Sequence, residues 1–412
     1  MQWYYCRAVL RMSDLTISDS IATTTTTTTI ASFLQNCLFS HLFMKLLYED
    51  IEDAYYRARR WKLKKPDIIA REENLEHNMK QLYAELCDET YMISPTKRFI
   101  ISDPVVREVI VLDFRDRIVQ HLIHHYLYPL RDKRFFYDVY SNRRGKGTLF
   151  GIQRLSKWIR WISDNFRQEA HVLKLDIQSF FLSVDRQTLR DLIIQDMRIL
   201  DPVRDKIWVL DLVKQFIFHD YVTWCDDKTS YREKSLLPHH KSLFSAPVGQ
   251  GMPLGNLTSQ LFANIYLHQF DLFVKHDLKI KYYGRYVDDF YLIHPSSDYL
   301  ISCLSQIRDF LYHRLHLTLH PHKIYLQSIH KGVKFLWVMV YPYHRTLAQR
   351  TIGRVFVKLS SCDYGPLRPI GHLPCEGRKT LLRRSMMSYR GLAIHHDCYR
   401  LRKIWYAKYL TL

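Results

Sequence analysis

The chain has 412 residues, and its 60 Lys and Arg against 41 Asp and Glu give a net charge of +19 at pH 7. A surplus of this size attracts polyanions or anionic membranes, which excludes an ordinary near-neutral metabolic enzyme as the default interpretation. Apolar residues make up 47% and charged residues 25% of the chain, a balance typical of a folded globular protein and not of a disordered one.

Residues 1–43 differ from the rest because they contain a run of seven threonines at 23–29. They predict a disordered leader or a wrongly assigned start, with Met44 as the alternative initiator. Helices are predicted over 45–60, 70–87 and 114–128, with two short strands at 99–101 and 108–112 joined by a turn at 103–104. The basic run 57–65, which contains Trp61, indicates either a solvated helix face or a contact with RNA or DNA.

A helix over 150–168 is predicted to lead into a strand at 171–176, and further helices lie between 186 and 220. Residues 224–246 form an insertion without usable periodicity. A long apolar helix over 256–278, a strand hairpin at 280–287 and 290–294, and an amphipathic helix capped by Ser296 or Ser297 follow. A strand pair at 324–329 and 333–340 and a basic helix at 378–403 complete the chain. Helices alternating with paired strands predict an α+β fold with a largely antiparallel sheet.

The eight cysteines contain no C-x-x-C pair, which favours a reducing cytosol over a zinc ribbon or a disulfide scaffold. No run of 18 or more apolar residues occurs, so we expect no transmembrane span and a cytoplasmic protein.

The strongest chemical signal is the pair Asp288 and Asp289 within the sequence YVDDF. Adjacent carboxylates between apolar strands repel each other, and a divalent cation compensates them well. An exposed turn is the alternative interpretation. Asp176, at the end of a buried-type strand, supplies a third carboxylate, although alone it is more typical of a strand end or cap. Three such carboxylates suit a two-metal site that activates a 3′-hydroxyl and neutralises a leaving pyrophosphate.

A third feature is the segment 249–260, GQGMPLGNLTSQ, in which glycines permit close backbone approach before the first turn of a helix. Together, the three features resemble the reverse transcriptase family in order and spacing. They match palm motif A (176–181), motif B (250–260) and motif C (286–289), and the resemblance extends from about 48 to 406. It implies a right-hand polymerase with N-terminal helices and fingers over 44–170, a palm over 171–345 with a fingers or insert segment within 186–246, and a short helical thumb over 346–412.

The resemblance implies two Mg²⁺ ions, with Mn²⁺ as a substitute, held by Asp176, Asp288, Asp289 and the backbone of Ile177. Phe181 would be the steric gate against a 2′-hydroxyl. Lys323 would be a general acid for pyrophosphate, with a surface lysine as the equal alternative. The remaining expected contacts are with the nucleotide, through Leu254, Gly255, Ser259, Gln260, Arg107 and Arg115, and with template and primer, through Tyr286, Val287, Lys334, Phe335, Arg143, Arg144 and Lys146.

Within the family, Leu254 stands where most members have Gln, and Gln260 where most have Pro. This combination resembles the enzymes of diversity-generating retroelements, which are bacterial or phage-encoded, and implies low fidelity at template adenines. Group II-like and phage-defence reverse transcriptases remain alternatives, as does a catalytically silent RNA-binding protein of the same fold. The implied partners are an RNA template, a DNA or RNA primer, dNTPs and a small basic accessory protein, with no membrane.

Overall fold

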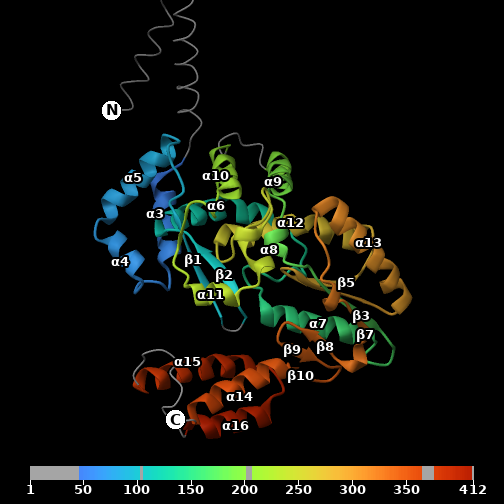
Figure 1. Ribbon diagram of the computed structural model, residues 1–412. Helices are drawn as coiled ribbons and strands as arrows, with labels where there is room; N and C mark the ends of the chain where they lie inside the picture. Colours follow the sequence, from blue (N-terminus) through green and yellow to red (C-terminus); the bar gives the residue numbers. More distant parts are fainter. Residues whose placement is uncertain (1–45, 103–104, 201–206, 364–374, 411–412) are drawn as a thin grey trace, which may run out of the picture.

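The computed structural model describes residues 46–102, 105–200, 207–363 and 375–410, so the predicted leader at 1–43 and the turn at 103–104 lie outside the described residues. The elements follow the hand-like order that the sequence predicted (Figure 1). The N-terminal helices lie at one side, a strand-rich centre follows, and the C-terminal helices form a separate group below it. None of the described helices is both long enough and apolar enough to cross a membrane.

The fingers are built from helices packed on α6 (Phe114–Asp132) and from a small sheet. The helices α3 (Tyr48–Arg59), α4 (Pro66–Glu72) and α5 (Leu75–Cys87) precede the hairpin of β1 (Thr96–Ile101) and β2 (Arg107–Val111). The insertion at 224–246, which showed no periodicity, contributes β4 (Cys225–Asp227) and α11 (Tyr231–Leu236). Strand β4 pairs in parallel with β1, and its three residues are too few to give a sequence pattern.

The palm is a four-stranded antiparallel sheet in the order β5-β6-β3-β7. Its strands are β3 (His171–Asp176), β5 (Tyr282–Tyr286), β6 (Asp289–His294) and β7 (Tyr325–Ser328). Helices α12 (Leu257–His276) and α13 (Ser297–Leu315) share one core with Leu173 and Leu175, whereas Val172 packs in a second core with α7 (Thr148–Ile162). Both faces of β3 are therefore buried, which explains its nearly continuous apolar run.

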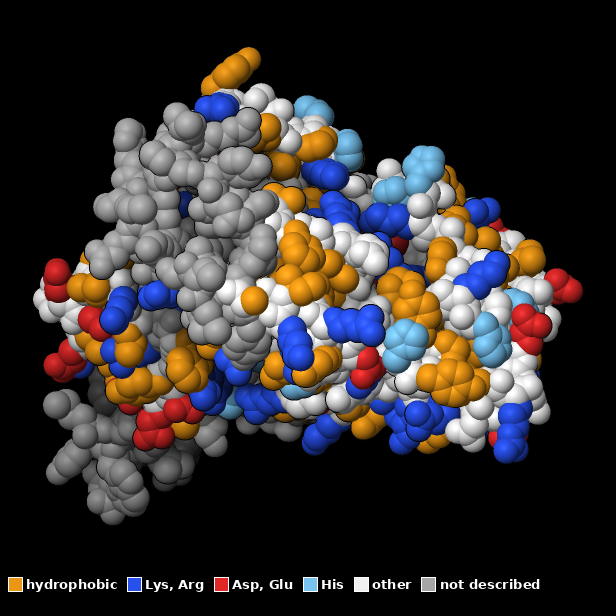
Figure 2. Space-filling model, turned by 90° about the horizontal axis from the view of Figure 1, so that it is seen from below, with side chains coloured by type: hydrophobic (Ala, Val, Ile, Leu, Met, Phe, Trp, Pro, Cys, Tyr) orange, Lys and Arg blue, Asp and Glu red, His pale blue; other side chains and the backbone are white. Residues whose placement is uncertain are grey.

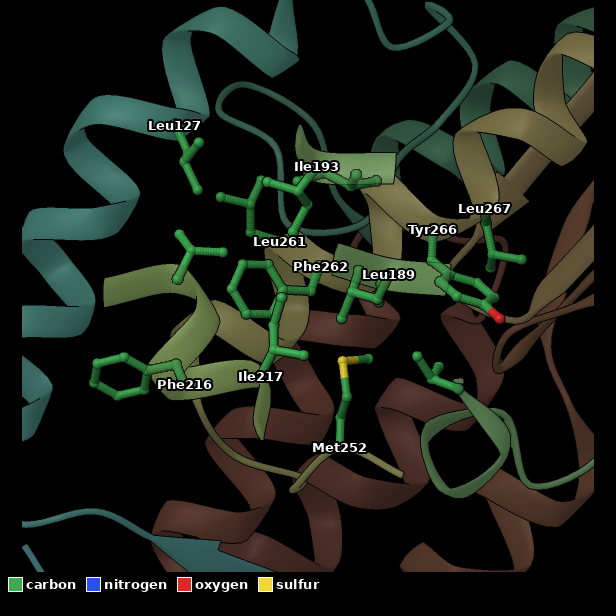
Figure 3. Packing of buried hydrophobic residues seen from close by; sticks show 14 of the residues in the cluster. Leu127, Leu189, Ile193, Phe216, Ile217, Met252, Leu261, Phe262, Tyr266 and Leu267 are labelled. Carbon is green, nitrogen blue, oxygen red and sulfur yellow. The ribbon is translucent and has the colours of Figure 1, made fainter. Parts of the chain in front are cut away.

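Three helices connect the palm strands to the segment that carries the glycine-rich loop. They are α8 (Phe180–Ser183), α9 (Arg186–Leu200) and α10 (Ile207–Phe218). Met252 from the loop is buried among side chains of this region, and Figure 3 shows it beside Leu189, Ile217 and Phe262. The glycine-rich loop is thus anchored in the core by one apolar side chain.

The predicted pairing of 324–329 with 333–340 is wrong, because β7 joins β3 in the palm sheet. The second run folds back on itself instead. Leu336 has a left-handed φ of 56° and forms the turn between β8 (Val333–Phe335) and β9 (Val338–Val340). Strand β10 (Arg345–Leu347) extends this separate three-stranded sheet.

The predicted basic helix at 378–403 is two helices, α15 (Cys375–Ala393) and α16 (Tyr399–Leu410), and α14 (Gln349–Asp363) precedes them. The break lies at Asp397, whose backbone N–H donates to the Arg345 carbonyl at 2.8 Å and whose carboxylate accepts from the Arg345 N–H at 2.9 Å. These two bonds fix the loop to β10. A helix through this point would lose both of them.

Candidate active site

The three predicted carboxylates lie at one end of the palm sheet. Asp176 is the last residue of β3 and stands directly opposite Asp289, the first residue of β6. Asp288 occupies the preceding turn, and its carbonyl accepts a hydrogen bond from the N–H of Ile177 at 3.3 Å. The backbone pairing of β3 with β6 therefore brings together residues that are more than a hundred positions apart in the sequence.

Burial and mutual repulsion act on these carboxylates. The pKa of Asp288 is raised to about 6, first by burial and then by the charge of Asp176. Burial also raises the pKa of Asp289. The ammonium of Lys174 opposes this rise, because its Nζ lies 3.1 Å from Oδ1 of Asp289. On the other side, Lys323 donates from Nζ to Oδ1 of Asp176 at 2.7 Å. The predicted general acid is thus inside the site, and Lys174 is a charge partner that the sequence analysis missed.

Carboxylate oxygens are the ligands that Mg²⁺ prefers, so the donor set suits a hard divalent cation. Burial, followed by the charge of Asp176, raises the pKa of Asp288, so a cation bound beside this carboxylate would stabilise its charged form. Among the described residues, no three His, Cys, Asp or Glu side chains are already arranged as a metal-holding group. Asp176 and Asp289 instead face Lys323 and Lys174.

The hairpin that carries Asp288 and Asp289 has an unusual backbone. Val287 has a φ of 55°, in the left-handed region that β-branched side chains rarely adopt. Two buried polar groups hold it there. The Val287 N–H donates to Oγ of Ser141 at 3.1 Å, and its carbonyl accepts from Nη1 of Arg285 at 3.0 Å. The fingers loop that contains Ser141 is therefore attached directly to the turn that carries Asp288.

Arg285 is held by α12. Its guanidinium is fully buried and makes two bonds to Asp271, Nε to Oδ1 at 2.7 Å and Nη2 to Oδ2 at 2.6 Å. Asn264 accepts from Nη1 of Arg285 at 3.3 Å and from Oγ of Ser141 at 3.2 Å. A charged residue within an apolar strand, and an aspartate on the apolar face of a helix, are the sequence signals that could have revealed this network.

The glycine-rich loop is tied to the chain that follows Asp176. The N–H of Met252 donates to the carbonyl of Phe181 at 2.7 Å, and that of Gly251 donates to the carbonyl of Val184 at 2.8 Å. The Phe181 ring is half-buried and packs edge-on against Phe180 at 5.3 Å between ring centres. The predicted steric gate and motif B are therefore joined by backbone hydrogen bonds.

On its other side the loop lies against the fingers hairpin. The carbonyl of Leu254 accepts from the N–H of Ile110 at 3.4 Å. Gly255 has a φ of 103°, and a Cβ there would come within 2.9 Å of the Val109 side chain, so only glycine fits without a shift. In the first turn of α12, Ser259 is buried and Gln260 is half-buried.

Three of the predicted contact residues are engaged within the protein. Arg115 pairs with Glu85 and lies over the Tyr91 ring at 4.9 Å. Arg143 is held by the carboxylate of Asp132 and nearby backbone carbonyls, with only 6% of its side chain exposed. Phe335 is fully buried in the second core. Their side chains make contacts within the fold, and a direct contact of these residues with substrate stays a prediction.

The other predicted contacts have solvent access to different degrees. Arg107, Arg144 and Lys334 are exposed, and Tyr286 is half-buried beside the carboxylates. Lys146 is half-buried, its Nζ lies 4.3 Å from the centre of the Tyr137 ring, and burial lowers its pKa to about 8. Seen from below, the described part of the molecule carries Lys and Arg side chains spread over its surface (Figure 2).

Comparison with solved structures gave distant likenesses, among them three telomerase structures that each match at a TM-score of 0.43. An apo telomerase from Candida tropicalis, truncated from its C-terminal domain, is 12% identical and covers 65% of this chain and 59% of its own. Telomerases in complex with a fragment of telomeric RNA, from Candida tropicalis and Candida albicans, are 10% and 12% identical and cover 74% and 79% of this chain. The alignments span 55% and 61% of those two proteins. A search of curated proteins found no match.

The family assignment comes from a different comparison. The sequence model of the family described as reverse transcriptase (RNA-dependent DNA polymerase) matches residues 103–340, more than half of the chain. The matched region contains all three carboxylates, the glycine-rich loop and Lys323. The chain therefore belongs to the reverse transcriptase family.

Proposed function

We propose that this protein is an RNA-directed DNA polymerase that extends a DNA or RNA primer with dNTPs along an RNA template. One observation carries the proposal. The antiparallel pairing of β3 with β6 sets Asp176 opposite Asp289, with Asp288 in the adjoining turn, inside the region that matches the family. A structural role alone gives no reason to group three carboxylates at a sheet end and bury them partly.

Two Mg²⁺ ions, or Mn²⁺ in their place, would be held by Asp176, Asp288, Asp289 and the backbone of Ile177. Such ions activate the attacking hydroxyl and neutralise the leaving pyrophosphate. In this proposal, the ring of Phe181 limits the space beside the sugar of the incoming nucleotide. The Lys323 side chain is 52% exposed, so it can leave Asp176 and donate a proton to pyrophosphate.

The direct test is primer extension on a defined RNA template with dNTPs and Mg²⁺. We expect product from the native protein and none from an Asp288→Ala, Asp289→Ala variant. Asp309→Asn, which removes one exposed carboxylate from α13, is the control and retains activity. The absence of metal-dependent product from a folded native protein contradicts the proposal. It would then favour a catalytically silent RNA-binding protein.

We further propose that the enzyme serves a diversity-generating retroelement, on the basis of Leu254 and Gln260 in motif B. The Leu254 side chain is half-buried in the loop between the palm and the fingers strand β2. An apolar side chain there lacks the hydrogen bond that glutamine offers near the template and nucleotide. A group II-like or phage-defence enzyme remains the alternative.

Sequencing of cDNA made from a defined RNA tests this assignment. We expect more errors opposite template adenine than opposite the other bases, and a lower adenine error rate in the Leu254→Gln variant. An adenine error rate equal to that at other bases contradicts the low-fidelity proposal. In the genome, a template repeat paired with a variable repeat, beside a gene for a small basic protein, would support the diversity-generating setting.

A further inference from the structure

Two basic segments that are far apart in the sequence meet on one side of α6. Arg57, at the end of α3, places Nη1 2.6 Å from Nδ1 of His125. Arg144, in the loop before α7, donates from its backbone N–H to the Tyr128 hydroxyl at 2.8 Å, and its guanidinium lies over the Tyr128 ring at 5.7 Å. His125 and Tyr128 are three positions apart and thus neighbours on the helix surface.

The same side of α6 continues toward the start of the helix. Arg117, His121, His124 and Tyr128 follow one another at spacings of four, three and four, which places them in one stripe. The turn between α3 and α4 brings further bases to this stripe. We call this surface the α6 basic face and define it by Arg57, Lys62, Lys65, Arg117, Arg144 and the histidines His121, His124 and His125.

The positive charges on this face repel one another. The pKa of His121 is lowered to about 4 by burial and then by Lys62, with further contributions from Arg57 and Arg117. The pKa of Lys62 is lowered by burial and then by Arg117 and Lys65. A bound polyanion would relieve this repulsion.

Few carboxylates face the surface. Asp53 pairs with Arg57 at 3.0 Å, and Asp67 pairs with Arg117. Asp50 accepts a hydrogen bond from Tyr126 at 2.8 Å. Lys62, Lys65 and Arg144 make no ion pair with any described residue, so their charges remain available.

An exposed aromatic residue lies at one end of the face. Trp61 is 89% exposed, has a left-handed φ of 65°, and lies below the Arg60 guanidinium at 5.5 Å. A large apolar ring held in water beside several bases is a suitable platform for a nucleobase, because stacking is available to every base. The run 57–65 therefore offers both phosphate contacts and a stacking surface.

We propose that the α6 basic face binds single-stranded RNA, with phosphates along Arg57, Lys62, Lys65 and Arg144 and one base stacked on Trp61. The choice of RNA over another polyanion rests on the proposed polymerase function. The surface itself uses none of the three carboxylates or the glycine-rich loop. RNA bound here would be held by its backbone, without dependence on sequence.

The test is equilibrium binding of a fluorescent, unstructured RNA of about 20 nucleotides, without primer, dNTPs or divalent metal, at several salt concentrations. The variant combines Arg57→Gln, Lys62→Gln and Lys65→Gln. Each lost phosphate contact reduces the salt slope by about 0.7 for a single strand, so we expect a decrease of about 2 and an affinity about 10- to 100-fold weaker.

A control removes the same number of charges from exposed positions elsewhere, through Lys214→Gln, Lys281→Gln and Arg308→Gln. It should change the affinity by less than about threefold. Trp61→Ala should weaken binding about 5- to 100-fold and leave the salt slope unchanged, because stacking releases no counterions. Thermal unfolding of each variant establishes that it is folded.

Equal losses in the triple variant and its control, or no loss in Trp61→Ala, overturn the proposal. Equal losses for RNA and for anionic lipid vesicles would identify a general polyanion site and also overturn it. The Asp288→Ala, Asp289→Ala variant should bind this RNA like the native protein. If the polymerase proposal fails, primer extension is absent. The binding experiment contains no primer or dNTPs, so its result does not depend on that outcome.

Discussion

The turn at Val287 shows how single residues set the geometry of the site. A β-branched residue in the left-handed region costs about 1–3 kcal/mol, and this cost persists only where neighbouring groups hold the backbone. Here the hydroxyl of Ser141 and the guanidinium of Arg285 hold both polar groups of the Val287 backbone. Asp288 and Asp289 follow immediately, so their directions depend on this turn.

Ser141→Ala should therefore slow catalysis more than it weakens substrate binding. The loss of one hydrogen bond, worth about 1 kcal/mol, lets the turn relax, so we expect kcat to fall about 5- to 10-fold with little change in the KM for dNTP. Val287→Gly, which removes the backbone strain, should restore part of kcat in the Ser141→Ala background. Steady-state primer extension measures both constants. A change in KM alone would contradict a positioning role.

Phe181→Val tests the steric gate at the same scale. The smaller side chain leaves room for a 2′-hydroxyl, so the ratio of kcat/KM for a ribonucleotide to that for the matching deoxyribonucleotide should rise by about 10-fold or more. Single-nucleotide extension with each substrate gives this ratio. Phe310→Leu, on the distant helix α13, is the control. An unchanged ratio in an active Phe181→Val enzyme would place the gate elsewhere.

At the residue scale, linear motifs predicted those site residues that lie within one short run of sequence. Asp288 and Asp289 are adjacent, and Asp176 ends a strand, so these positions required no knowledge of distant partners. Arg115 and Arg143 show the opposite case, because the groups that hold them, Glu85 and Asp132, are nearby only in the folded chain. The network around Arg285 was missed for the same reason.

Among the elements, long periodic segments were predictable and short pairings were not. Helices α12 and α13 present wide apolar faces over many residues, and both were expected. Strand β4 has only three residues, and its parallel pairing with β1 depends on a contact across more than a hundred positions. The predicted partner of β7 was wrong because strands that are neighbours in sequence usually pair. Here β7 pairs with β3, which is a longer strand than β8.

Buried Arg98 joins the three strands of the fingers sheet, so we expect the stability of the protein to depend on it. Its guanidinium lies 2.7 Å from Glu108 on β2 and 3.0 Å from Asp227 on β4, with 9% of its side chain exposed. Arg98→Met should lower the free energy of unfolding by about 3–5 kcal/mol, because Glu108 is then buried without its partner. Chemical denaturation measures this loss. Lys97→Met, at the exposed neighbouring position, is the control and should change stability by less than about 0.5 kcal/mol.

A double variant separates the ion pair from simple loss of packing. Adding Glu108→Gln to Arg98→Met removes the unpaired buried charge, so the double variant should be more stable than Arg98→Met alone. If both variants unfold at the same denaturant concentration, the pair contributes only through the volume of its side chains.

At the scale of the whole molecule, burial and the surrounding positive charge lower the pKa of four histidines. The pKa values of His121, His124, His268 and His396 are each lowered to about 4, in every case first by burial. Charged neighbours of the same sign add to this effect at all four positions. A protein with this surplus of bases therefore keeps several histidines neutral at pH values where the unfolded chain protonates them.

The free energy of unfolding should consequently fall as pH is lowered from about 6.5 to 4. In this window the unfolded chain binds protons that the folded histidines reject, so each histidine removes roughly 1–2 kcal/mol. Asp288, whose pKa is raised to about 6, and Asp116 and Asp289, whose pKa values are raised by burial, bind protons in the folded state and act in the opposite direction. The histidines with lowered pKa outnumber these acids, so acid should destabilise the fold.

Urea unfolding at pH 7 and pH 5 measures the loss of unfolding free energy. Two pairs of histidine variants then show which residues cause it. His121→Gln with His124→Gln removes two of the responsible groups and should reduce the loss between the two pH values. His77→Gln with His313→Gln, at two exposed positions, changes the same number of histidines and should leave the loss unaltered. If both pairs behave alike, the pH dependence arises from the carboxylates. The basic surface would then have no part in the acid sensitivity of the protein.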